Sequence, residues 1–173
     1  MDKIAVLFST TDGHTISICN RIGNSLSKKG AVIIASLENI SEREINNADK
    51  ILIGASVRYG KHNKALYSFI KKHKNSLHTK ENAFFSVNAV ARKREKSEPE
   101  TNPYVIKFLQ QSAWKPGKIA VFAGKIDYPK YKFIDRYMIR FIMWLTNGPT
   151  DTSKSFEFTE WSKVDDFASN LFN

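Results

Sequence analysis

The sequence predicts one α/β domain built on a doubly wound, five-stranded parallel sheet. Three observations predict this class. The 173 residues suit a single domain. Short apolar runs alternate with segments of helical period. The first run, Ile4–Phe8, is continuously apolar, as in a strand covered on both faces. Residues 125–154 break the alternation, and we expect them to form an insertion that interrupts the fifth strand.

Five segments have the length and composition of buried strands. They are Ile4–Phe8, Ala31–Ser36, Lys50–Ala55, Ala83–Val87 and Ile119–Gly124. A sixth segment, Ser155–Phe158, alternates like a strand fragment. Right-handed crossovers between consecutive parallel strands then give the doubly wound order.

The segments between the strands carry apolar residues at helical spacing. The first helix places Ile18, Ile22 and Leu26 on one face, and we expect Gly30 to stop it near residue 29. Ser41 and Glu44 have the spacing of a capping box. Later helices are expected over 66–73, 103–114 and 161–171, and residues 91–102 are expected to form an exposed loop.

The charge balance favours anionic partners, because 27 lysines and arginines face 17 acidic residues and give a net charge of +10. A basic surface that serves solubility is the alternative. The lone cysteine, Cys19, allows no intrachain disulfide and indicates a reducing compartment. We find no signal peptide, no run approaching the ~18 apolar residues of a membrane span, no nucleic-acid module and no metal-ligand spacing. The chain is therefore expected on the cytoplasmic side, without nucleic acid or metal.

The loop after the first strand has the composition of a phosphate cradle. It combines hydroxyls, a glycine and a helix start in Ser9, Thr10, Thr11, Asp12, Gly13, His14 and Thr15. It lacks the Gly-Lys-Ser/Thr of a Walker loop and the Gly-x-Gly-x-x-Gly of a dinucleotide site. An ordinary serine- and threonine-rich helix cap is the alternative interpretation.

This segment resembles the phosphate loop of flavodoxins, which implies the flavodoxin-like strand order 2-1-3-4-5 and FMN as cofactor. The Asp12 backbone, rather than its carboxylate, is then expected to face the ligand. The resemblance extends to two loops that would contact the flavin ring, in which Tyr59 is a stacking candidate. Their implied cofactor residues are Ser56, Val57, Arg58, Tyr59, Gly60 and Ser86, Val87, Asn88, Ala89, Val90.

Several motifs are more specific than the flavodoxin pattern. Residues 54–60, 85–93, 101–104 and 128–131 look like those of the menaquinone-dependent protoporphyrinogen IX dehydrogenases, a flavodoxin-like family of protoporphyrinogen oxidases. The resemblance implies oxidation of protoporphyrinogen IX to protoporphyrin IX in haem biosynthesis, with electrons passed to menaquinone or another respiratory quinone. Two alternatives stay open: a general FMN-dependent quinone reductase, and a flavodoxin-type electron carrier, against which the positive net charge counts.

The insertion contains an amphipathic helix over residues 132–145. Phe133, Ile134, Tyr137, Met138, Phe141, Ile142 and Leu145 recur at helical spacing, with Trp144 beside them, and Lys132, Arg136 and Arg140 form a cationic stripe. Such a helix is expected to lie in an anionic membrane surface, which would make the protein peripheral on the cytoplasmic face of the inner membrane. Packing of its apolar face on the sheet is the alternative.

Basic residues near the flavin are candidates for binding the substrate's propionates. They are Arg58, Arg92, Lys93 and Arg94, and the alternative for residues 92–96 is a solvated loop. No general base is identified; Arg58 and His62 are the weak catalytic candidates. The place of Arg58 in a ring loop predicts that its charge favours the reduced flavin.

Overall fold

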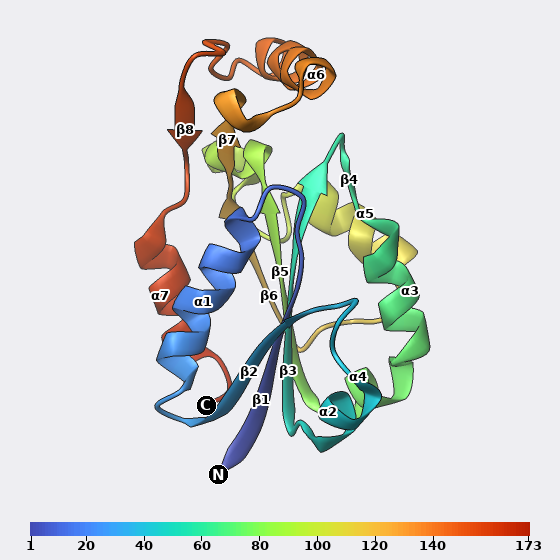
Figure 1. Ribbon diagram of the computed structural model, residues 1–173. Helices are drawn as coiled ribbons and strands as arrows, with labels where there is room; N and C mark the ends of the chain where they lie inside the picture. Colours follow the sequence, from blue (N-terminus) through green and yellow to red (C-terminus); the bar gives the residue numbers. More distant parts are fainter.

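The computed structural model describes residues 1–173 and contains the predicted parallel sheet (Figure 1). Its strands lie in the order β2-β1-β3-β5-β6, which confirms the predicted 2-1-3-4-5 because the extra strand β4 only forms a hairpin with β3. The strands are β1 (Asp2–Ser9), β2 (Gly30–Ser36), β3 (Lys50–Arg58), β4 (Lys61–His62), β5 (Glu81–Asn88) and β6 (Lys118–Ala123).

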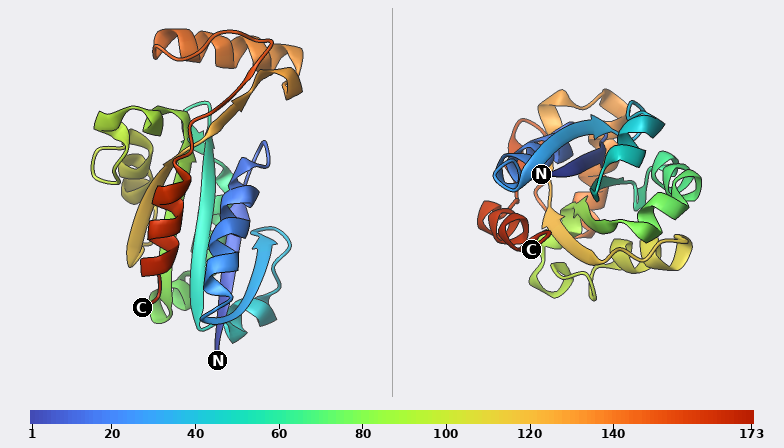
Figure 2. Two further views of the ribbon diagram at one scale, coloured as in Figure 1. Left: turned by 90° about the vertical axis from the view of Figure 1, so that its left-hand side faces the viewer. Right: turned by 90° about the horizontal axis from the view of Figure 1, so that it is seen from below.

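Helices cover both faces of this sheet (Figures 1 and 2). One face carries α1 (His14–Leu26) and α7 (Trp161–Asn170), and the other carries α2 (Glu42–Asn47), α3 (Lys64–Lys72), α4 (Lys74–Thr79) and α5 (Pro103–Gln111). Alternate residues of β1 point to opposite layers: Ile4 and Val6 pack under α1, and Ala5 and Leu7 pack towards α3. The continuous apolar run of β1 is therefore buried on both faces, as predicted.

The insertion differs from the prediction in its position. It does not interrupt the fifth strand of the main sheet. Instead β6 ends at Ala123, and the insertion lies between β7 (Lys125–Asp127) and β8 (Ser155–Glu157), an antiparallel pair that forms a separate small sheet. Between them follow the 3-10 helix η3 (Tyr128–Lys130) and α6 (Phe133–Leu145). The expectation was wrong because Ser155–Phe158 is too short and too polar to rejoin a sheet that is covered on both faces.

Three further boundaries differ from the sequence predictions. Helix α1 ends at Leu26, and Gly30 opens β2 instead of closing the helix; a side chain there would collide with the backbone oxygen of Asp2. The helix expected over 66–73 is α3, which begins two residues earlier at Lys64 and ends at Lys72, and a further helix, α4, follows it from Lys74 and was not predicted. The loop expected over 91–102 contains the 3-10 helices η1 (Ala89–Arg92) and η2 (Arg94–Lys96).

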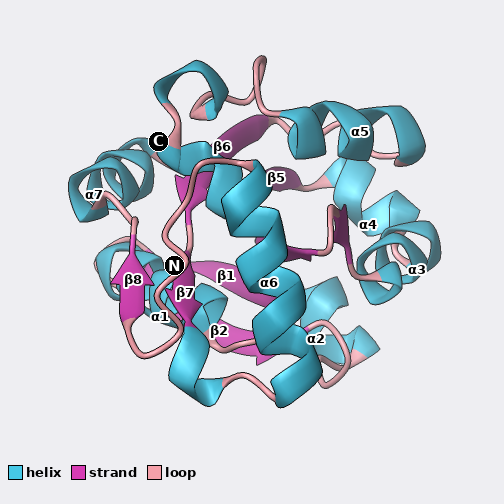
Figure 3. Ribbon diagram, turned by 90° about the horizontal axis from the view of Figure 1, so that it is seen from above, coloured by secondary structure: helices cyan, strands magenta, loops and turns pink.

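Helix α6 lies across the carboxyl ends of the parallel strands (Figure 3). A Schellman motif ends it: Asn147 has a left-handed φ of 55°, Gly148 N–H donates to the Met143 carbonyl, and Asn147 N–H donates to the Trp144 carbonyl. Both chain termini lie at the opposite end of the molecule from α6 (Figure 1).

Candidate functional site

A cleft at the carboxyl ends of the strands collects most of the predicted cofactor residues. It encloses about 820 Å³, including the part open to solvent. Its lining includes every predicted cofactor residue except Ser9, Gly13 and Ser86. The lining residues outside the predicted cofactor set are Tyr104, Gly124, Lys125, Ile126, Tyr131, Ile139, Ile142 and Met143. Three loops from distant parts of the chain therefore meet in one site.

The first loop presents an uncapped helix end to the cleft. Gly13 has a φ of 88°, which glycine adopts without strain, and its N–H donates to Thr10 Oγ1 at 3.0 Å. No side chain caps α1, and the amides of His14 and Thr15 keep their donors free for an anion, while the Ile16 amide donates to the Gly13 carbonyl. Thr15 is 1% exposed, lines the cleft, and its Oγ1 has no hydrogen-bond partner in the protein. An orphaned buried hydroxyl beside free amides fits a bound phosphate group.

His14 lies at the same end of the cleft and is held as a neutral imidazole. Burial lowers its pKa, the Glu157 carboxylate opposes this shift, and Lys125 adds to it. His14 Nε2 lies 2.6 Å from Thr159 Oγ1, whose single proton goes to the Ala123 carbonyl at 2.7 Å. Thr159 therefore accepts from His14, which assigns the neutral tautomer with the proton on Nε2.

The second loop is a tight hairpin between β3 and β4. Arg58 pairs with Lys61, so the loop has two residues, Tyr59 with φ 51° and Gly60 with φ 76°. Two positive φ values are the signature of a type I′ turn, which suits the twist of paired strands. The hairpin projects the half-exposed Tyr59 ring into the lining of the cleft.

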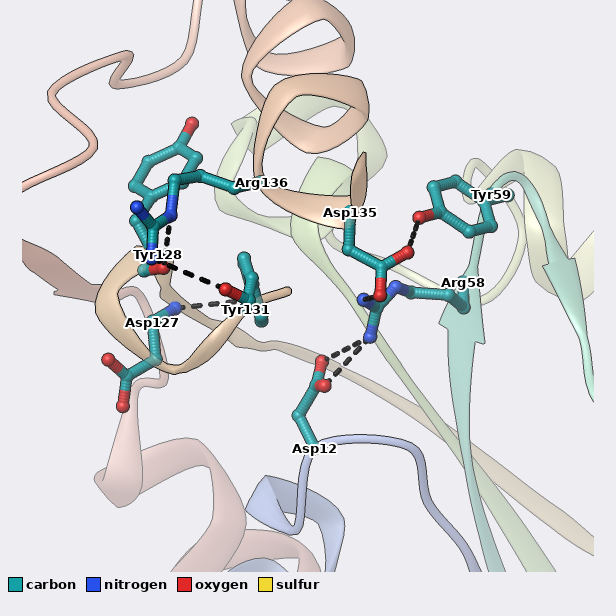
Figure 4. A network of polar contacts seen from close by, with 8 residues as sticks. All are labelled: Asp12, Arg58, Tyr59, Asp127, Tyr128, Tyr131, Asp135 and Arg136. Carbon is teal, nitrogen blue, oxygen red and sulfur yellow. Dashed lines mark hydrogen bonds and ion pairs between the residues drawn. The ribbon is translucent and has the colours of Figure 1, made fainter. Parts of the chain in front are cut away.

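Arg58 connects this hairpin to the phosphate loop and to α6 (Figure 4). Its Nη1 donates to both carboxylate oxygens of Asp12, at 2.7 and 2.9 Å, and its Nη2 lies 3.6 Å from Asp135 of α6. The guanidinium also stacks on the rings of Tyr59 and Tyr131, at 5.4 and 5.1 Å. Burial opposes its charge, but the Asp12 carboxylate outweighs burial and raises the pKa of Arg58. The carboxylate of Asp12 is thus engaged with Arg58, as expected if its backbone faces the ligand.

The third loop rests on a buried polar network. The side-chain amides of Asn88 and Asn102 bond each other reciprocally, at 3.0 and 3.3 Å. Asn88 also donates to Ser86 Oγ, which lies 2.9 Å from His62 Nε2. Asn102 caps α5 by accepting from Tyr104 N–H. Because these buried amides satisfy one another, they fix the position of β5 against α5.

His62 belongs to this network and does not line the cleft. It is 4% exposed and packs against the rings of Phe84 and Phe108. Burial lowers its pKa to about 4. His62 was a weak catalytic candidate because it follows a predicted ring loop, but the type I′ turn reverses the chain and directs the imidazole into the sheet–helix interface.

Several predicted cationic residues use their donors on the protein itself. Arg92 donates to the carbonyls of Ala89 and Thr146, both at 2.8 Å, and Arg136 donates to the carbonyls of Tyr128 and Tyr131. These two arginines close turns instead of facing solvent, which differs from the expected exposed stripe and solvated loop. Lys132, Arg140 and Arg94 are exposed, and Lys93 is half-buried.

Helix α6 has two apolar sides. Ile139 and Met143 are 6% and 2% exposed, and together with the half-buried Ile142 they line the cleft. The other side carries seven of the ten exposed large apolar residues of the chain: Phe133, Ile134, Tyr137, Met138, Phe141, Trp144 and Leu145. Ile142 was predicted on the outer face and instead faces inward. No helix is long and apolar enough to cross a membrane.

The residues present fit a flavin nucleotide. Two buried polar atoms of the lining have no partner in the protein: Thr15 Oγ1 in the first turn of α1, and Arg58 Nε at the hairpin. Half of the residues that line the cleft are hydrophobic, as suits a flat ring system. No group of three His, Cys, Asp or Glu side chains lies close enough to hold a metal ion.

Comparisons with known proteins agree with this geometry. A family described as a flavodoxin domain matches residues 5–153. The chain is 43% identical, over 98% of its length and 94% of the relative's, to a protoporphyrinogen IX dehydrogenase (quinone) of Escherichia coli K12. It is 41% identical to the protein of the same name from Leishmania major, over 98% of this chain and 74% of that one.

Solved structures show the same fold at low identity. The two-electron reduced flavodoxin of Megasphaera elsdenii matches with a TM-score of 0.54 and 14% identity, covering 68% of this chain and 84% of that one. The flavodoxin of Fusobacterium nucleatum bound to flavin mononucleotide matches with a TM-score of 0.50 and 20% identity, covering 72% of both chains.

Proposed function

The chain belongs to the flavodoxin-domain family of quinone-dependent protoporphyrinogen IX dehydrogenases, and from this membership we propose that it is an FMN-dependent enzyme of haem biosynthesis. It oxidises protoporphyrinogen IX to protoporphyrin IX and passes the electrons to menaquinone or another respiratory quinone. The observation that carries this proposal is the cleft at the sheet edge, which joins a phosphate cradle, two ring loops and an apolar roof.

The phosphate end of the cleft would hold the nucleotide by its anionic group. The free amides of His14 and Thr15 at the start of α1 and the hydroxyl of Thr15 supply donors there. The neutral His14 adds no charge, and the Asp12 carboxylate is kept away by its ion pair with Arg58. Binding through amides and hydroxyls is the flavodoxin way of holding FMN that the sequence resemblance implies.

The ring end of the cleft would orient the isoalloxazine and keep water from it. Tyr59 and Asn88 come from the two ring loops, and Met143 with its neighbours on α6 closes the apolar side. Bound FMN supplies the reversible electron acceptor, while the protein supplies binding, orientation and electrostatics. The fixed charge of Arg58, stacked on two tyrosine rings, stays ionised at all physiological pH values.

The outer face of α6 supports attachment to the cytoplasmic face of the inner membrane. Phe133 and Trp144 are 72% and 65% exposed, a large exposure for side chains of this size. Lys132 and Arg140 flank this face and would add attraction to anionic lipids, about 1 kcal/mol each. A protein held in this way places its cleft at the surface in which a lipid-soluble quinone is dissolved.

Flavin uptake and turnover test the proposed reaction. The purified protein is expected to show a flavin absorption spectrum or to quench the fluorescence of added FMN. Anaerobic protoporphyrinogen IX with a menaquinone analogue is expected to yield protoporphyrin IX, measured by its fluorescence. Turnover of the quinone with NAD(P)H, without reaction of the porphyrinogen, would instead identify a general quinone reductase. A folded protein that takes up no flavin would refute the whole proposal.

Vesicle binding tests the proposed location. The double variant Phe141→Glu, Trp144→Glu is expected to lose co-sedimentation with anionic vesicles, because both side chains lie on the exposed face of α6. Ile106→Glu is the matched control, since Ile106 is 39% exposed on α5 and lies outside the insertion. Equal sedimentation of all three proteins would show that α6 does not contact lipid.

A further inference from the structure

Helix α6 is tied to the flavin site at both ends by arginines of the two ring loops. At its first turn, Asp135 accepts a hydrogen bond from the Tyr59 hydroxyl and lies 3.6 Å from Arg58 Nη2 (Figure 4). Both partners belong to the β3–β4 hairpin. Asp135 is the third residue of the helix, so its side chain points back towards the turn from which the helix starts.

The other end of α6 is held by the third loop. Arg92 of η1 donates through Nη1 to the Ala89 carbonyl of its own loop and through Nη2 to the Thr146 carbonyl that follows α6. Gly148 permits this approach, because a side chain there would lie within 3 Å of Arg92 Nη2. One guanidinium therefore joins the second ring loop to the end of the helix.

Little apolar burial holds α6 between these two ties. Only Ile139 and Met143 are buried, in a small cluster with Ile126, Tyr128 and Tyr131 that is separate from both main core clusters. A helix with so small a buried face depends on specific polar contacts for its position. The two arginine ties are the contacts that attach it to the loops around the ring site.

We propose that Asp135 is a positioning residue: it holds Tyr59 and Arg58 in place, so that docking of α6 and occupation of the cleft by flavin are coupled. This inference rests on the proposed FMN site. Tyr59 occupies a left-handed conformation that a non-glycine residue adopts at a cost, and its hydroxyl contact with Asp135 is what α6 contributes to keeping it there. Anything that loosens α6 then releases a wall of the flavin site, and bound flavin in turn holds α6 down.

Variants of Asp135 test the coupling by flavin affinity. Asp135→Ala removes the acceptor of Tyr59 and the partner of Arg58, and is expected to raise the FMN dissociation constant about fivefold, the effect of about one hydrogen bond. Asp135→Asn keeps an acceptor for Tyr59 and loses only the charge, and is expected to raise the constant about twofold. Asp151→Ala is the matched control, because Asp151 lies in the same insertion but contacts only Ser153 and Lys154.

Hydrogen exchange without flavin provides a second readout that does not depend on the cofactor. Asp135→Ala is expected to speed amide exchange both in residues 133–145 and in the hairpin at 58–62, whereas Asp151→Ala leaves both unchanged. Arg92→Lys is expected to speed exchange in residues 142–148, since one ammonium cannot reproduce the two directed bonds of the guanidinium.

The two readouts separate this inference from the proposed function. A wild-type protein that binds no flavin refutes the FMN proposal, while the exchange data still decide whether Asp135 fixes the hairpin. Unchanged exchange in the hairpin, or an FMN dissociation constant for Asp135→Ala equal to that of Asp151→Ala, overturns the coupling.

Discussion

Helices α1 and α6 are each thirteen residues long and each has an apolar face, yet they use it in opposite ways. Helix α1 buries its face completely against the sheet, with Ile18, Ile22 and Leu26 at 0% exposure. Helix α6 buries only Ile139 and Met143 and leaves a larger apolar face uncovered. The body of the domain thus buries its apolar residues in the core, whereas the insertion leaves most of its own apolar residues available for contact outside the chain.

The largest expected effect is on the free energy of unfolding, where a core residue of the body is compared with a buried residue of the insertion. Phe84 is fully buried, stacked 4.2 Å from Phe108, and Phe84→Ala is expected to lower the free energy of unfolding by about 3–5 kcal/mol. Met143→Ala is expected to cost about 2 kcal/mol or less, because the insertion can open locally while the body stays folded. Denaturant unfolding of both variants measures the difference; equal losses would show that the insertion is part of one cooperative core.

A smaller effect is expected on the pH dependence of stability, through His62 in the body of the domain. The pKa of His62 is about 4 in the folded protein and about 6.5 when exposed, so the unfolded chain binds more protons between these values. The contribution of His62 to the free energy of unfolding is therefore fully present above pH 6.5, and about 3 kcal/mol of it is lost as the pH drops towards 4. His62→Gln, which cannot titrate, is expected to flatten this part of the stability–pH curve measured by urea unfolding. A variant curve parallel to that of the wild type would show that other groups cause the loss.

The smallest expected effect lies at the junction of the two regions. Arg58→Glu removes a positive charge beside the ring site and adds a negative one, so it disfavours the reduced form of bound FMN. Asp12 and Asp135 already offset much of the Arg58 charge, and we expect the midpoint potential to fall by only about 20–40 mV. Arg94→Glu makes the same charge change at an exposed position outside the cleft and should leave the potential unchanged. Identical midpoint potentials for both variants would show that the Arg58 charge does not affect the flavin.

The sheet was predictable from the sequence because apolar runs of strand length alternate with segments of helical period, and its strand order because several segments resemble those of flavodoxins. Continuous runs such as Ile4–Phe8 can only be buried on both faces, and the loops after such strands must meet at one edge. The three loops at this edge could be located for this reason, whereas their expected roles in holding a phosphate and a flavin ring came from the resemblance to flavodoxins. Helix α4 was missed because it has six residues and buries only Leu77, too little to give a helical pattern of apolar residues.

The insertion was the less predictable region. A helical pattern shows that Ile139, Ile142 and Met143 are apolar, but Phe133, Tyr137 and Phe141 are equally so, and the sequence does not say which side packs on the domain. Arg92 and Arg136 were expected to be exposed. Their actual partners are backbone carbonyls, and a sequence does not reveal hydrogen bonds of this kind. Gly60 after Tyr59 did carry a signal for a hairpin turn, and that signal would have turned His62 away from the ring.

Both chain termini lie at the pole farthest from α6 (Figure 1). A fluorescent label, an affinity tag or a surface tether joined to either end would project away from the cleft. Immobilisation through a terminus would therefore present the uncovered helix to added vesicles and leave the cleft entrance accessible, which makes single-molecule and surface-based versions of the binding experiments practicable without redesign of the chain.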